Sequence, residues 1–211
     1  MVNVEEWISD RRRPENTVHY GKVQRFLKAE EQFQVQPADR QDIIRWTNEF
    51  IVEYRKKFLR ECEVQAVENE IRINEVSVTD YLRDFNKRTK EKYELTNMRD
   101  IVWMKFASTG HLGVVACSND VNFDFPADQK SYDERRGSRW KYNTSGIILH
   151  YLSCHGRERL EWDQSSFLVF PLQGLESGRE GKRQRRQLET GIGNYLIYKG
   201  VPILDYYSHR I

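Results

Sequence analysis

The stretch FLVFPLQGLESGREGKRQRRQLETGIGNYLIYKGVPILDYYSHRI, residues 167–211, carries most of the information about the fold. Its first six residues are apolar except for one proline and predict a buried strand. Residues 173–187 are rich in glycine and cations and predict a basic linker. Residues 188–200 predict an amphipathic helix, and residues 201–207 predict a last strand that ends in polar side chains.

The helix predicted over residues 188–200 has one apolar face, formed by Leu188, Ile192, Tyr195 and Leu196. Gly191 and Gly193 lie within it, and each glycine costs a helix roughly 1 kcal/mol relative to alanine. Such a cost indicates that another part of the chain approaches this helix closely.

Outward from this stretch, the chain between residues 96 and 166 is rich in short apolar segments separated by turns. Residues 100–106 and 112–117 flank a Ser-Thr-Gly turn and predict a hairpin. Alternating or apolar patterns predict further strands at residues 121–125, 140–142 and 147–152. We therefore expect a mostly antiparallel sheet of about six strands.

The chain before residue 95 has mainly helical patterns. The clearest helix is predicted over residues 38–61, with Asp39 as its cap and apolar side chains at helical spacing. Helices are also predicted at residues 3–12, 16–34 and from residue 77 onward, whereas residues 62–76 are ambiguous and allow an edge strand.

These patterns predict an α+β fold in which an N-terminal helical half packs on the antiparallel sheet. Residues 1–95 form the helical region, and residues 96–211 form the β-rich region with the C-terminal helix and strand. We expect the two regions to make one compact domain.

The overall composition excludes several classes of protein. The 34 basic and 32 acidic residues leave a net charge of +2, so partners must be inferred from local clusters. The three cysteines are odd in number and far apart, which argues against a disulfide framework and favours a reducing, cytoplasmic setting. No apolar run approaches the roughly 18 residues of a membrane helix, so we expect no membrane partner.

The basic linker is the strongest local signal for a function. Five cations fall within eight residues: Arg179, Lys182, Arg183, Arg185 and Arg186. Such a cluster predicts contacts with nucleic-acid phosphates, with a strong dependence on salt. A solvated loop without a partner is the alternative explanation.

Three carboxylates, Glu158, Glu161 and Asp163, lie within six residues. Carboxylate oxygens are ligands that Mg²⁺ prefers, so these residues are candidate metal ligands, with Glu161 and Asp163 as candidate catalytic groups. A charged hairpin explains the same residues without a metal, and no Glu-x-Lys follows on a convincing strand.

A second catalytic candidate lies at the end of the chain, where Asp205, Tyr207 and His209 alternate to one face of the predicted strand. Asp205 and His209 suit general acid or base chemistry, although hydrogen bonding to buried tyrosines explains the pattern equally well. His150, Cys154 and His155 are a further candidate metal set, which needs a ligand from elsewhere.

The leading hypothesis is a nucleic-acid-binding protein. If it is catalytic, we expect a phosphodiester hydrolase that uses Mg²⁺. The alternative is a non-enzymatic interaction or assembly protein of viral or mobile-element type, with self-association into a homo-oligomer. A third hypothesis is a small-molecule enzyme with its site near His209.

Overall fold

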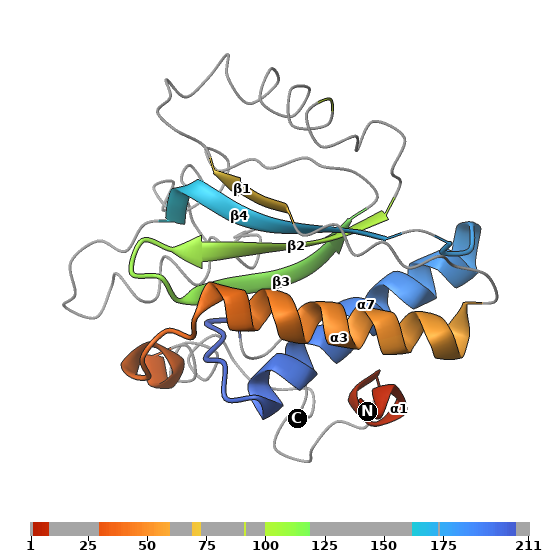
Figure 1. The fold of residues 1–211 in the computed structure, drawn as a ribbon, viewed down its shortest axis with the longest axis horizontal. Helices are drawn as coiled ribbons and strands as arrows, with labels where there is room; N and C mark the ends of the chain where they lie inside the picture. Colours follow the sequence, from red (N-terminus) through yellow and green to blue (C-terminus); the bar gives the residue numbers. More distant parts are fainter. Residues whose placement is uncertain are drawn as a thin grey trace, which may run out of the picture.

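The computed structural model describes seven parts of the chain: residues 2–8, 30–59, 69–72, 91, 100–118, 162–172 and 174–205. Within them, one antiparallel sheet lies against a layer of helices (Figure 1). No helix of these parts is both long enough and apolar enough to cross a membrane.

The sheet has four strands in the order β1-β4-β2-β3. The strands are β1 (Asn69–Arg72), β2 (Asp100–Ala107), β3 (Leu112–Ser118) and β4 (Trp162–Leu172). The predicted hairpin is confirmed as β2 and β3, and Gly110, with φ of 87°, takes a turn conformation that suits glycine. The edge strand allowed within residues 62–76 is β1.

Strand β4 lies inside the sheet, between β1 and β2. It pairs antiparallel with both neighbours, and Val102 lies opposite Phe170 while Met104 lies opposite Leu168. All four side chains are buried in the core. The predicted strand at residues 167–172 is therefore confirmed and begins five residues earlier.

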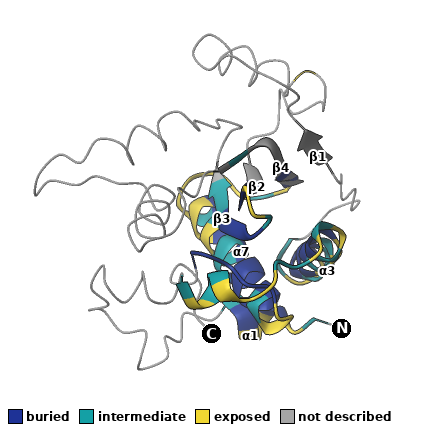
Figure 2. Cartoon of the chain, turned by 90° about the vertical axis from the view of Figure 1, so that its left-hand side faces the viewer, coloured by how far each residue is buried: buried dark blue, intermediate teal, exposed yellow. Residues whose placement is uncertain are grey.

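Helices α3 (Arg40–Phe58) and α7 (Gly178–Tyr198) cover one face of the sheet, and α1 (Val4–Ile8) packs beside α7 (Figure 1). Asp39 caps α3, since its carboxylate accepts a hydrogen bond of 2.7 Å from the Gln41 amide. In Figure 2 the buried residues gather where these helices meet one another and the strands. The helices predicted over residues 38–61 and 3–12 are confirmed as α3 and α1.

The predicted sheet of about six strands is wrong, because the described residues form four. The predicted last strand is replaced by a single parallel bridge between Ile203 and Leu112. The helical layer is also not an N-terminal half, since α7 near the end of the chain supplies much of it. The strands predicted at 121–125, 140–142 and 147–152, the helix predicted from residue 77, and most of that predicted over 16–34 lie outside the described residues.

Gly191 of α7 lies against side chains of both α1 and α3. A Cβ atom at this position would overlap the Cζ atom of Phe50 and lie 2.8 Å from Cγ2 of Ile8. Phe50 is fully buried, so its ring has little room to move. The close approach inferred from the glycines is therefore found at Gly191.

We predict that Gly191→Ala destabilises the protein by up to about 2 kcal/mol, because an overpacking cost of about 1–3 kcal/mol outweighs the roughly 1 kcal/mol gain in helix propensity. Urea unfolding measures the change. In the Gly191→Ala background, Phe50→Leu should cost less than it does in the wild type, because it makes room for the added methyl group. Equal costs of Phe50→Leu in both backgrounds would contradict the steric account.

Candidate nucleic-acid interface

The basic segment is not a linker, because it forms the first half of α7. The helix begins at Gly178, after Ser177 in an extended conformation. Four cations then recur at the spacing i, i+3, i+4, i+7, which places them on one helical face. We call this set the basic stripe, and its members, all exposed, are Arg179, Lys182, Arg183 and Arg186.

The basic stripe points away from the protein core. The buried positions in the same part of the helix are Gly181, Gln184 and Leu188. At 100° per residue these three positions lie on the opposite side of the helix from the stripe. Arg185 is half-buried and lies about 110° from the centre of the stripe, so it is not a member.

Two partly buried hydrogen bonds fix the helix that carries the stripe. The Gln184 carboxamide oxygen accepts a hydrogen bond of 2.8 Å from the Glu176 amide. The Tyr54 hydroxyl of α3 donates one of 2.9 Å to the Gln187 carboxamide oxygen. Burial is the main reason that the pKa of Tyr54 rises from 10.0 to about 12, so this phenol stays protonated as a donor at neutral pH.

One acidic residue lies beside the stripe. Glu180 accepts hydrogen bonds from the Arg183 guanidinium, one of them 2.8 Å from Nε, and a second contact joins Oε1 and Nη2. These bonds lower the pKa of Glu180 and raise that of Arg183. Both side chains are exposed to solvent, and the pair partly neutralises the stripe at its centre.

Two of the predicted catalytic residues, Asp163 and Asp205, lie in the described parts of the chain but on opposite sides of the β2–β3 hairpin. Asp163, on β4, forms an ion pair of 2.8 Å with Arg40 at the start of α3. Asp205 is 6% exposed, and its amide donates to the Gly113 carbonyl at the outer edge of β3. With β2 and β3 between them, the backbones of these two residues lie three strand spacings apart, about 14 Å across the sheet at about 4.8 Å per strand.

The stripe and Asp205 do not meet. The helix rises about 18 Å from Arg186 to Tyr198, and Asp205 follows beyond that end. In the parts of the chain that the structure describes, no three His, Cys, Asp or Glu residues form a metal-binding group. Several predicted site residues fall outside these parts, namely His150, Cys154, His155, Glu158, Glu161, Tyr207 and His209.

Sequence reasoning identified the cations but missed the helix that arranges them. Gly178, Gly181 and the run of charges obscure the amphipathic pattern. The missing signal is the buried row of the helix, which continues backward from Leu188 through Gln184 to Gly181 at the spacing of α-helical neighbours. Because Gly181 is small and Gln184 is polar, a search for apolar side chains at helical spacing does not detect this buried row.

Comparisons with protein-family models, curated proteins and solved structures find no significant match to this chain. The interface must therefore be judged on its own geometry and charge.

Glu189 lies one turn beyond the stripe, and its carboxylate accepts a hydrogen bond of 3.2 Å from the Cys117 amide on β3. Burial raises the pKa of this carboxyl, while that hydrogen bond and nearby Arg186 oppose the rise. The folded protein therefore holds this proton more tightly than the unfolded chain. The stabilisation that comes from this tighter proton binding is complete below the ordinary carboxyl pKa of 4.5. It is lost as the pH rises through the pKa of Glu189 in the folded protein.

We predict that Glu189→Gln removes the loss of stability with rising pH, because glutamine carries no titrating group. Its carboxamide oxygen can still accept the hydrogen bond from the Cys117 amide. The stability of the variant relative to the wild type should increase as the pH rises above the ordinary carboxyl pKa. Urea unfolding at a series of pH values from 4 to 8 measures the difference. A stability difference that is constant, or that shrinks as the pH rises, would contradict the burial of this carboxyl.

Proposed function

We propose that the protein binds nucleic acid through the basic stripe of α7. The observation that carries the proposal is the placement of four exposed cations on one helical face, opposite the buried face. Cations gathered on one face can neutralise neighbouring phosphates, which releases condensed counterions and favours binding.

The position of the stripe supports a partner that carries negative charge. Cations near the start of a helix oppose the helix dipole, and like charges four residues apart repel each other. Glu180 is the one acidic residue in the first turn of α7. Bound phosphates would offset both the repulsion among the cations and their unfavourable interaction with the helix dipole. Without a bound anion, both effects remain.

We predict that replacing the four stripe cations with glutamine weakens binding most at low salt. The slope of log K against log salt should become shallower by roughly 0.7 to 0.9 for each lost phosphate contact. Fluorescence anisotropy with labelled single-stranded DNA, duplex DNA and RNA measures both effects and distinguishes the three partners. The control is Lys56→Gln with Lys57→Gln on α3, which removes two exposed cations outside the stripe. It is compared with the stripe double variant Arg179→Gln with Lys182→Gln, which removes the same charge.

The proposal fails if the control weakens binding as much as the stripe double variant does, or if the wild type binds no nucleic acid at low salt. If the wild type binds no nucleic acid, the alternative is an interaction or assembly protein. Light scattering would support this alternative if the mass of the particles increases with protein concentration. Self-association and a cytoplasmic setting remain predictions. Hydrolysis also remains a prediction, either with Mg²⁺ held by Glu158, Glu161 or Asp163 or through His209 with Asp205.

Glu180→Gln should strengthen nucleic-acid binding, whereas the loss of stripe cations should weaken it. Removing the carboxylate frees the Arg183 guanidinium from its present partner. We expect nucleic acid to bind more tightly by severalfold at low salt, with a steeper salt dependence, because one more cation can reach a phosphate. Unchanged or weaker binding would show that Arg183 does not contact the nucleic acid.

A further inference from the structure

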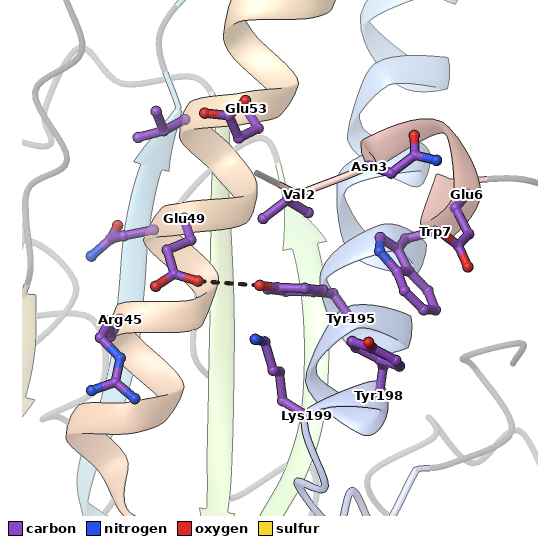
Figure 3. Close-up of a pocket in the computed structure, with 12 residues that line it drawn as sticks. Val2, Asn3, Glu6, Trp7, Arg45, Glu49, Glu53, Tyr195, Tyr198 and Lys199 are labelled. Carbon is purple, nitrogen blue, oxygen red and sulfur yellow. Dashed lines mark hydrogen bonds between the residues drawn. The ribbon is translucent and has the colours of Figure 1, made fainter.

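A pocket of about 790 Å³ lies among α1, α3 and α7, with residues of all three helices in its walls (Figure 3). This volume falls within the range of about 300–1,000 Å³ that is typical of small-molecule sites. Figure 3 shows the strands behind the helices, so the pocket opens on the side of the helical layer away from the sheet. Two core residues, Trp7 and Tyr195, form part of its wall.

Stacked aromatic rings form one wall of the pocket. The ring centroids of Trp7 and Tyr198 are 4.7 Å apart, and those of Tyr195 and Tyr198 are 6.4 Å apart in a stacked arrangement. Trp7 and Tyr195 are buried, whereas Tyr198 is 64% exposed. An exposed ring supported from behind by two buried rings is a rigid surface on which a ligand can pack.

The aromatic faces around the pocket already hold a cation. The Lys199 ammonium lies 5.2 Å from the ring centroid of Tyr195 and 5.9 Å from that of Trp46. Both distances are within the reach of about 6 Å for a cation–π interaction. Figure 3 shows this side chain pointing into the space between α3 and α7.

Carboxylates complete a site for positive charge. Glu49 accepts a hydrogen bond of 3.1 Å from the Tyr195 hydroxyl, and Glu6 lines the same pocket. Burial, and next the bond to Glu49, raise the pKa of the Tyr195 hydroxyl to about 12. Glu53, which pairs with Lys56 at 2.6 Å, also lines the pocket. Arg45 pairs with Asp42 at 2.6 Å, and its guanidinium lies 5.5 Å from the ring centroid of Trp46. The lining therefore carries three carboxylates and two cations, and Glu49 is the carboxylate bonded to a pocket ring.

We propose that this pocket binds a small organic cation with an ammonium or guanidinium group. The charged group takes the position of the Lys199 ammonium beside Tyr195 and Glu49, and the rest of the ligand packs on the exposed ring of Tyr198. Lys199 then acts as a tethered competitor, which leaves when the ligand binds. The site is independent of the nucleic-acid proposal, because it uses none of the stripe residues.

The test is a titration of the full chain with agmatine, which carries a guanidinium and an ammonium group. The indole N–H signals of Trp7 and Trp46 should shift with saturation in nuclear magnetic resonance spectra. Lys199→Met should bind agmatine more tightly by severalfold, because the competitor is gone. Glu49→Gln and Tyr198→Ala should each weaken binding roughly two- to fivefold, as expected for the loss of an exposed carboxylate partner or of a packing ring.

The matched control is Lys182→Met, which removes an exposed ammonium from the stripe face of the same helix and should leave the affinity for agmatine unchanged. Butylurea, a neutral analogue, should not compete. The three pocket substitutions fall on exposed residues, and thermal unfolding checks that each variant folds. The proposal is overturned if butylurea binds equally well, if Lys199→Met binds no more tightly than the wild type, or if no agmatine binds.

Discussion

The close approach of three helices at Gly191 is the constraint on which the helical layer depends. Gly191 has no side chain, so two neighbouring helices can pack directly on the backbone of α7 there. The contacts are made by the ring of Phe50 on α3 and by the side chain of Ile8 on α1. The neighbouring side chain of Asn194 then donates a hydrogen bond of 2.8 Å to the Trp7 carbonyl, which ties α1 to the same helix. One small residue thus sets the positions of α1, α3 and α7.

This constraint gives α7 different roles on its different faces. The face that is buried against α3 and β3 belongs to the core, so the cations at the start of the helix are directed to the solvent. Near the other end, the same packing brings Trp7, Tyr195 and Tyr198 together beside the carboxylates of α1 and α3. The phosphate-binding face and the cation pocket that we propose therefore share one scaffold without sharing residues.

Elements with strong local patterns were predicted well. The periodic helix α3, the β2–β3 hairpin and the apolar strand β4 were all predictable because each is specified by residues close in sequence. The place of β4 between β1 and β2 was not predictable, since it depends on pairing between segments far apart in the chain. The residues of the basic stripe were predicted, but their shared face was not, because Gly181 and Gln184 occupy the buried row. The pocket joins three distant segments and has no local pattern.

The most direct test of this account is nuclear magnetic resonance of the arginine Nε–H groups during titration with an oligonucleotide. We predict helical backbone shifts for residues 179–187 in the free protein. On titration, the Nε–H signals of Arg179, Arg183 and Arg186 should shift together, and that of Arg45 on α3 should stay in place. Random-coil shifts over residues 179–187, or a shift of Arg45 as large as those of the stripe, would contradict the account.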